Sequence, residues 1–392
     1  MRLPAMTMAA ALFTALAACG APPPSPQARS QRHQPGTAAA SPAGPQPFTL
    51  LASGDVLPHA EIIRQAADDA GENGYDFSKM LADVKPVVSA ADLAICHMET
   101  VYGADGGPFS GWPTFKSPPQ VARALKDAGY ASCDTASNHS LDDGPDGIRR
   151  TLDAMDAVGL AHTGSARTAD EAGAPALLRV HGAVVAQLAY TYGTNDIPLP
   201  PGQPWAVNLI DRDRILSDAR AARDAGADIV VVSLHWGTEW QDEPNDQQLS
   251  LTRELTADQP ADAPDIDLIL GTHAHIPQAY EKVNGTWTVY GMGDQIAGQM
   301  YNYTGAKDPR GNWSSIARFT FSPPAGPGRR WTVTKAEFLP QLMDGPPYRV
   351  LDLGAAVRRN PDRADLARAL DHIRTVVLSR GGADAGLTMA PP

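Results

Sequence analysis

A long apolar run that ends in a histidine constrains this sequence more than any other feature. Residues 228–237 read DIVVVSLHWG, and a helical stretch at 211–227 leads directly into them. An uninterrupted apolar run is typical of a strand inside a parallel sheet, which is buried on both faces. Similar strands alternate with helical stretches from about Phe48 onwards. The sequence therefore predicts an α/β fold.

The remaining elements follow from the same reading. We expect helices at about 75–90, 120–128, 144–159 and 362–380, of which the third has apolar positions three to four residues apart. We expect strands or β-rich runs at 48–55, 91–100, 130–139, 176–191, 266–275, 286–294 and 314–340. The sequence has no internal repeat and no GxxxxGK[ST] phosphate-binding loop.

Composition excludes some classes of function. The net charge is −12 and there is no basic run, which argues against nucleic acid as a partner, because phosphate contacts need clustered Lys and Arg. Three cysteines (Cys19, Cys96 and Cys133) are too few for a disulfide scaffold, and no CxxC pair is present. Cys96 and Cys133 lie near the ends of strands that we expect to be neighbours. Both a disulfide and two buried thiols fit, and the thiols are favoured.

The first residues resemble a targeting segment. LAAC (16–19) follows a short apolar run and resembles a bacterial lipobox, which implies cleavage of residues 1–18 and acylation of Cys19. An ordinary secretory signal is the alternative. Residues 19–46 are rich in Pro, Ala and Ser, and we expect a disordered tether there. The chain is therefore expected on the extracytoplasmic face of the cell membrane, attached through lipidated Cys19.

Polar side chains with metal-binding chemistry follow five of the apolar runs. Ligands bind beyond the carboxyl ends of the strands in open α/β sheets, so we expect these side chains to meet at one edge. Carboxylate, amide and imidazole groups in this number exceed what one tetrahedral ion needs, and they suit two divalent ions of Mn, Fe or Zn that share a carboxylate. The candidate ligands are Asp55, Glu99, Asn138, His235, His273 and His275.

Each candidate also has a structural alternative. Asp55 can cap a helix, Glu99 can be a solvated charge, and Asn138 can close an Asx-turn. His235 can be a satisfied buried histidine, and the GTHAH pair can belong to an ordinary turn. Outside this set, His59 and His97 are each either a ligand or a residue at the rim. We expect structural roles for His162, His181 and His372.

Taken in order, the motifs resemble a known family. They are GD (54–55), ADLAICHMET (91–100), ASNHSLDDG (136–144), SLHWGTEW (233–240), GTHAHIPQ (271–278) and VYGMGD (289–294). Together they resemble the CapA family of bacterial poly-γ-glutamate capsule proteins, which is related to calcineurin-like metallophosphoesterases. The resemblance implies a four-layer α/β/β/α sandwich of the metallophosphoesterase type over residues 47–345, followed by a C-terminal helix and tail at 346–392.

The resemblance also implies roles for individual residues. His139 matches the histidine that contacts the substrate anion and protonates the leaving group. Asp142 and Glu239 match residues that support the ligands or face the substrate. Lys116 lies on a Gly/Pro-rich loop and either faces an anionic substrate or is solvated.

The sequence departs from the family pattern in four places. His59 comes too late to complete an opening Asp-x-His motif, and His97 stands where the family has an amide. Thr272 and Ala274 replace family residues inside GTHAH, and Asp294 stands where asparagine is expected. These departures affect the exact ligand set more than the existence of the site.

Three functions remain open from the sequence. The first is a surface lipoprotein resembling CapA, with metal-dependent action on poly-γ-glutamate or another capsule or cell-envelope polymer in synthesis, anchoring or transfer, and with capsule-synthesis machinery as a partner. The second is an extracellular metallophosphoesterase that hydrolyses a phosphoester. The third is a non-catalytic polymer-binding or scaffold protein.

Overall fold

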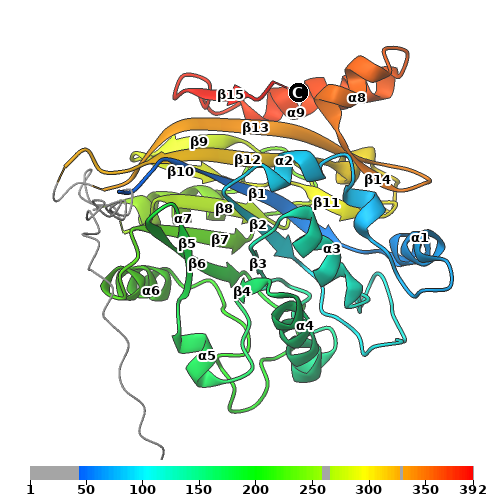
Figure 1. Ribbon diagram of the computed structural model, residues 1–392, viewed down its shortest axis with the longest axis horizontal. Helices are drawn as coiled ribbons and strands as arrows, with labels where there is room; N and C mark the ends of the chain where they lie inside the picture. Colours follow the sequence, from blue (N-terminus) through cyan, green and yellow to red (C-terminus); the bar gives the residue numbers. More distant parts are fainter. Residues whose placement is uncertain (1–43, 258–264, 327–329, 392) are drawn as a thin grey trace, which may run out of the picture. The chain divides into compact units, whose positions relative to one another are not determined.

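The computed structural model describes residues 44–257, 265–326 and 330–391. The expected signal segment, Cys19 and most of the expected tether fall within residues 1–43 and therefore lie outside the described residues. From Gly44 onwards the chain forms two β-sheets with helices on their outer faces (Figure 1).

The first sheet has nine strands around a parallel centre. Strands β1, β2, β3 and β4 run parallel in that order, while β12, β13 and β14 extend the sheet antiparallel on the other side of β1. Two further strands join at its margins, β11 beside β1 and β15 beside β13. The strands are β1 (Phe48–Leu57), β2 (Leu93–Met98), β3 (Ser132–Asp134), β4 (Ala161–Thr163), β11 (Asp294–Ala297), β12 (Trp313–Ser322), β13 (Thr332–Asp344), β14 (Arg349–Asp352) and β15 (Leu387–Met389).

The second sheet has six strands in the order β5-β6-β7-β8-β10-β9. Its four central strands are parallel, and an antiparallel strand closes each edge. The strands are β5 (Ala176–Val180), β6 (Ala183–Thr191), β7 (Ile229–His235), β8 (Leu268–Thr272), β9 (Tyr280–Val283) and β10 (Thr286–Val289).

Helices complete four layers. The inner faces of both sheets share one apolar core, in which Leu50 of β1 and Val231 of β7 are both fully buried. The outer face of the first sheet packs against α1 (Ala60–Ala70), η1 (Ser78–Leu81), α2 (Lys85–Ser89), α3 (Gln120–Ala128) and α4 (Gly144–Val158). The outer face of the second sheet packs against α6 (Arg212–Asp224) and α7 (Asp246–Thr256). The predicted α/β/β/α layering is therefore confirmed.

Several predicted elements differ in extent. The single helix expected at 75–90 is wrong: η1 and α2 occupy part of this stretch, because Pro86 lacks the N–H that a continuous helix needs and stands instead in the first turn of α2. Five helices lie outside the stretches expected to be helical: α1, α7 and the short α5 (Ala169–Gly173), η2 (Pro309–Asn312) and α8 (Leu353–Arg359). Helix α9 (Ala364–Val377) falls within the stretch expected at 362–380, and it packs into the inner core.

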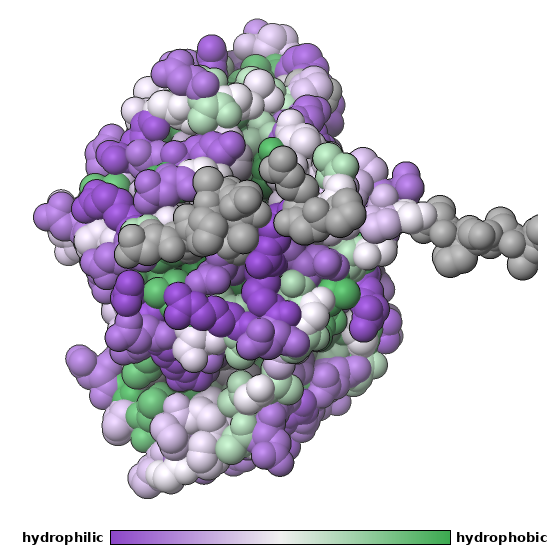
Figure 2. Space-filling view, turned by 90° about the vertical axis from the view of Figure 1, so that its left-hand side faces the viewer, coloured by the Kyte–Doolittle hydropathy of each residue, from purple (hydrophilic) through white to green (hydrophobic). Residues whose placement is uncertain are grey.

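Two further observations bear on surfaces. Figure 2 looks at the side of the molecule where β1 begins, and its visible described surface is mainly hydrophilic with scattered hydrophobic residues. Within the described ranges, every helix is too short or too polar to cross a membrane.

Candidate metal centre

The parallel strands bring polar side chains to one edge at the same level. In the first sheet, Asp55 of β1 lies opposite His97 of β2, and His97 lies opposite Asp134 of β3. Asp294, the first residue of β11, pairs with Asp55 from the other side. In the second sheet, His235 is the last residue of β7. The strand order of both sheets therefore creates the edge at which ligands are expected.

Two groups of buried side chains have the spacing of metal ligands, and both contain Asp55. Within each group, one ligand atom from every residue lies within 4.8 Å of the others. One group is Asp55, His97 and His235, and the other is Asp55, Glu99, His275 and Asp294. A carboxylate common to two groups is the arrangement that bridges a pair of ions in two-metal enzymes.

The donor atoms of this cluster are buried without partners. Within the described residues, six of them have no hydrogen bond: Asp55 Oδ1, His97 Nε2, Glu99 Oε1 and Oε2, His273 Nδ1 and Asp294 Oδ2. An unsatisfied buried polar group costs about 1–3 kcal/mol, and more when it is charged. Cations held at the two groups would satisfy the atoms that belong to those groups, and mixed oxygen and imidazole donors suit Mn, Fe or Zn. The residues present therefore fit a metal centre.

His97 is held by a carboxylate behind it. Its Nδ1 donates to Asp134, while its Nε2 lies 3.4 Å from Asp55 Oδ1. A carboxylate behind an imidazole fixes the tautomer and the ring orientation of metal-binding histidines. Burial by itself lowers the pKa of His97, but the Asp134, Asp55 and Asp294 carboxylates together outweigh it and raise the pKa above its ordinary value. His97, expected as either a ligand or a rim residue, and Asp294, expected as a possible supporting or substrate-facing residue, both contribute atoms to the cluster itself.

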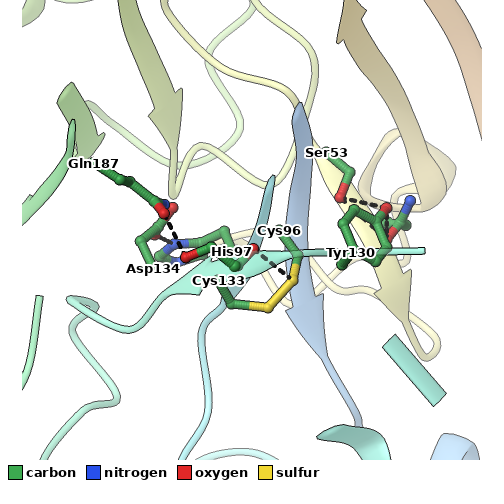
Figure 3. The surroundings of a disulfide bond; sticks show 9 residues. Ser53, Cys96, His97, Tyr130, Cys133, Asp134 and Gln187 are labelled. Carbon is green, nitrogen blue, oxygen red and sulfur yellow. Dashed lines mark hydrogen bonds and ion pairs between the residues drawn. A yellow bond between two sulfur atoms is a disulfide. The ribbon is translucent and has the colours of Figure 1, made fainter. Parts of the chain in front are cut away.

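A disulfide joins the two strands directly beside this pair. Cys96 of β2 and Cys133 of β3 are paired in register, with their Cα atoms 4.4 Å apart, and they form a disulfide bond (Figure 3). The favoured expectation of two buried free thiols is therefore wrong. The sequence places both cysteines near strand ends but does not show the register, and the register is what brings the sulfur atoms together.

The second sheet supplies imidazoles from two strand ends. His235 Nε2 lies 2.8 Å from Asn138 Oδ1, and its Nδ1 lies 3.0 Å from Thr272 Oγ1. The His273 amide donates to Asp55 Oδ2 over 3.2 Å, so the GTHAH loop contacts the carboxylate shared by both groups. Burial lowers the pKa of His235 and of His273 well below the ordinary value, so both are neutral and able to bind a cation.

The backbone of the GTHAH loop is strained. His273 has φ of 90° and His275 has φ of 60°, a region that few residues other than glycine occupy. Strain of this kind persists only where the surrounding structure enforces it, and it concentrates at functional sites. The loop therefore adopts an unfavourable backbone conformation that places two imidazoles beside Asp55.

His275 connects the cluster to its surroundings. Its Nδ1 lies 3.0 Å from Asp294 Oδ1, and its Nε2 lies 3.9 Å from Glu239 Oε1. Burial raises the pKa of Asp294 to about 7, although His275 works against this shift. Burial and the nearby Asp55 carboxylate also raise the pKa of Glu99 well above its ordinary value. The Glu239 side chain is 44% exposed, so it stands at the border of the cluster.

A cavity of about 890 Å³ opens beside the cluster, and both His275 and His139 line it. His139 Nδ1 lies 2.7 Å from Asp142 Oδ2, which also accepts the backbone N–H of Phe115 over 2.6 Å. Asp142 therefore holds the Nδ1–H tautomer and leaves Nε2 of His139 for proton transfer. A molecule in the cavity can contact His139 and the metal cluster together.

Two further candidates lie apart from the cluster. His59 is on the cavity wall, where its Nδ1 lies 3.0 Å from Leu57 O and burial lowers its pKa to about 4. Lys116 pairs with Asp143 over 3.6 Å and is not among the residues that line this cavity. Lys116 is therefore an ion-paired residue outside this cavity.

Sequence reasoning missed two residues of the site. Asp134 ends an apolar run as Asp55 does, so the rule that selected Asp55 also selects Asp134. Tyr192 follows β6 and its ring lies 4.5 Å from that of His273, while 43% of the residue remains exposed. No sequence pattern marks Tyr192, because its place depends on how the loop after β6 packs.

Solved structures with some similarity include phosphoesterases. Calcineurin-like phosphoesterase YfkN from Bacillus subtilis aligns with a TM-score of 0.43 at 10% identity, over 84% of this chain and 99% of that chain. The NAD nucleotidase of Haemophilus influenzae aligns with a TM-score of 0.44 at 11% identity, over 88% and 64%.

Two of the sequence relatives are capsule biosynthesis proteins. The PGA biosynthesis protein CapA of Bacillus subtilis is 29% identical over 186 residues, which are 47% of each chain. The capsule biosynthesis protein CapA of Bacillus anthracis is 27% identical over 190 residues, 47% of this chain and 44% of that protein. The chain thus spans about half the length of these curated relatives. The family described as "Bacterial capsule synthesis protein PGA_cap" matches residues 49–299, well over half of the sequence. This chain therefore belongs to the PGA_cap family of bacterial capsule synthesis proteins.

Proposed function

We propose that this protein is a metal-dependent hydrolase or transferase that acts on poly-γ-glutamate or another polymer of the capsule or cell envelope. One observation carries the proposal: buried donor atoms without partners converge on Asp55 beside a cavity that His139 also lines. The PGA_cap family supplies the polymer context. A purely structural site has no need of a cavity or of a histidine oriented for proton transfer.

The ligand set divides between the two sheets. Divalent ions, when bound, act as Lewis acids that stabilise negative charge on a reacting ester, amide or phosphoryl oxygen. The residues that would bind these ions are Asp55, His97, Glu99, Asn138, His235, His273, His275 and Asp294. Asp134 orients His97, as the carboxylates behind metal-binding histidines do.

The chain's own residues supply the proton. His139, with its Nδ1 bonded to Asp142, delivers a proton from Nε2 to the leaving group. Phe115 packs edge-on against the His139 ring with centroids 4.8 Å apart, which limits its rotation. Glu239, partly exposed beside His275, is placed to contact an incoming substrate.

Turnover of test substrates checks this assignment. The purified protein, supplied with Mn²⁺ or Zn²⁺, is assayed against bis(p-nitrophenyl) phosphate and against a γ-glutamyl isopeptide. We expect turnover that His139→Ala lowers about 10²–10⁴-fold without loss of metal. His162→Ala is the matched control, because His162 pairs with Asp156 on the surface.

Each outcome has a distinct meaning. Turnover of the phosphodiester alone favours the phosphoesterase alternative over action on an amide polymer. Metal uptake with no turnover of either compound contradicts an enzyme and favours a scaffold that uses metal structurally. Turnover that is equal in the wild type and in His139→Ala removes His139 from the reaction.

We further propose that the protein works outside the cytoplasm, attached to the membrane through lipidated Cys19 and close to capsule-synthesis machinery. The Cys96–Cys133 disulfide supports this location, because disulfides persist in oxidising compartments. Replacement of the acylated residue (Cys19→Ser) is expected to release the protein from the membrane fraction. Retention of Cys19→Ser in that fraction would contradict the lipid anchor.

A further inference from the structure

We propose that the cavity beside the metal centre binds a glycan, with sugar rings stacked on an aromatic rim. This inference narrows the substrate class of the proposed function and rests on it for the reaction. The binding itself depends only on the cavity. A polyanionic polypeptide such as poly-γ-glutamate is the competing occupant.

The distribution of exposed aromatic side chains carries the inference. Among the described residues, the large hydrophobic side chains left exposed are Trp112, Tyr192, Tyr301, Tyr303 and Met389. Three of these five line the cavity, and the ring of a fourth, Tyr192, lies 4.5 Å from that of His273 at the cluster. Trp112 is 76% exposed and Tyr303 is 85% exposed. Exposed hydrophobic residues that gather at one place, rather than singly, mark a binding surface.

Both loops that carry these rings are anchored on the first turn of α1. Gly111, beside Trp112, lies so close to α1 that a Cβ there would be 2.5 Å from the Ala60 nitrogen. Gly298, just before the tyrosines, lies so close that a Cβ would be 2.2 Å from Glu61 Oε1. At Gly111 the neighbouring atoms belong to the backbone, so no side chain fits there. At Gly298 they belong to the Glu61 and His59 side chains, and the Gly298 N–H donates to His59 Nδ1 over 3.2 Å. The two loops are therefore held at a fixed spacing across the cavity.

The tyrosine loop is also braced internally. Tyr301 forms an antiparallel β-bridge with Lys307, and the backbone N–H of Asn302 donates to the backbone oxygen of Ala306 over 2.9 Å. Gly305 closes the turn by donating to Asn302 O over 2.8 Å. Because these hydrogen bonds hold the conformation of the loop, they also hold the Tyr303 ring in its exposed position.

Charge around the cavity disfavours a polyanion. Outside the metal cluster, its charged lining consists of Glu61, Glu239 and a single cation, Arg64. His59 adds no positive charge, since burial lowers its pKa to about 4. Lys116 does not line the cavity and is paired with Asp143. A chain with a carboxylate on every residue would meet two carboxylates here and one guanidinium.

A glycan matches both properties of the cavity. The C–H faces of a pyranose ring are apolar and stack on Trp and Tyr rings, while its hydroxyls accept and donate hydrogen bonds at the ring edge. Carboxylates and amides such as Glu61, Glu239 and Asn302 lie along the same lining as partners for hydroxyls. In pockets that combine aromatic walls with a few polar groups, the polar groups fix the orientation of the bound ligand.

Direct binding measurements separate the two occupants. The protein, both loaded with metal and stripped of metal with EDTA, is titrated with cellohexaose, with hexa-N-acetylchitohexaose and with a γ-glutamyl hexamer, by calorimetry and by tryptophan fluorescence. We expect at least one of the two glycans to bind and the γ-glutamyl hexamer not to bind. Trp112→Leu should weaken glycan binding at least about 10-fold, whereas Trp112→Phe, which keeps a ring, should weaken it less than about 3-fold.

Two controls establish that a loss of binding arises at the cavity. Met389→Ala removes an exposed hydrophobic side chain outside the cavity and should leave binding unchanged. Equal melting temperatures of the variants show that each is folded. Binding of the γ-glutamyl hexamer in place of the glycans overturns the inference, as does equal glycan affinity in Trp112→Leu and the wild type. The absence of binding by all three oligomers also overturns it.

The two proposals fail separately. Glycan binding by a protein that takes up no metal contradicts the proposed function and leaves the glycan site standing. Metal uptake with turnover of a test ester, but without glycan binding to either form of the protein, contradicts the glycan site and leaves the proposed function standing.

Discussion

At the scale of single residues, the centre depends on side chains that hold the ligands in place. Asp134 accepts from His97 Nδ1, and Asp142 does the same for His139. Each carboxylate fixes which ring nitrogen faces the reacting groups. The functions proposed for the two histidines differ because His97 Nε2 lies 3.4 Å from Asp55, while the His139 ring lines the cavity.

Loss of the carboxylate behind His97 should weaken metal binding. We expect Asp134→Asn to lower metal affinity about 10–100-fold, as removal of such partners does in other metal sites. Competition with a chromophoric chelator measures this change. Asp143→Asn is the control, because Asp143 pairs with Lys116 away from the cluster. Equal affinities of Asp134→Asn and the wild type would show that His97 is not a ligand.

Asp294 should make the metal-free protein sensitive to pH. Its pKa is about 7 in the folded state and 3.8 ordinarily. Between about pH 4 and 7 the folded state keeps a proton that the unfolded state has lost, so stability falls as the pH rises. Asp294→Asn lacks this titration. The free energy of unfolding in urea of Asp294→Asn, relative to that of the metal-free wild type, should therefore increase from pH 4 to pH 7. A difference that stays constant over this range would contradict the raised pKa of Asp294.

The sequence predicts some of these residues better than others. Asp55, His235 and His273 follow or end apolar runs, so strand patterns and the edge rule find them. Asp134 obeys the same rule but ends a strand of only three residues, SCD, which gives a weak pattern. Tyr192 and Trp112 lie on loops, and their positions depend on packing that no local periodicity encodes.

At the scale of elements, register decides what the strands contribute. The pairing of β2 with β3 sets Cys96 opposite Cys133 and His97 opposite Asp134 in consecutive positions. A shift by one residue would break the disulfide and separate the imidazole from its carboxylate. The disulfide therefore fixes the same register that the candidate metal site requires.

Removal of the disulfide should destabilise the protein measurably. The bond spans 37 residues of sequence, for which we expect a loss of about 2–4 kcal/mol in the double variant Cys96→Ala/Cys133→Ala. Urea unfolding of the metal-free protein measures the loss without a contribution from bound ions. An unchanged midpoint would mean that the two sulfur atoms are not bonded in the native protein.

Element boundaries show where sequence patterns lose information. Helix α3 begins and ends where predicted, since Gly129 with positive φ follows it directly. Helix α7 was not predicted, because its polar sequence DQQLSLTRELT has a weak apolar stripe and its start depends on the Asn245 capping box. Tertiary packing, rather than propensity, decides such segments.

At the scale of the whole molecule, the fold places one site between two sheets. The parallel strands of both sheets end at the same edge, so ligands from β1 and β2 meet ligands from β7 and β8. The alternation of strands and helices predicted the layers. The order of the nine-stranded sheet, with β11 and β12 both beside β1, required the structure.

Metal content tests the central claim most directly. Protein purified and reconstituted with Mn²⁺, Fe²⁺ or Zn²⁺ is analysed by inductively coupled plasma mass spectrometry, with Asp55→Asn, His235→Ala and His273→Ala in parallel. We predict about two ions per wild-type chain and the largest loss in Asp55→Asn, whose carboxylate belongs to both groups. Metal-free wild-type protein after reconstitution, or equal metal content in all three variants and the wild type, would contradict a metal centre built on Asp55.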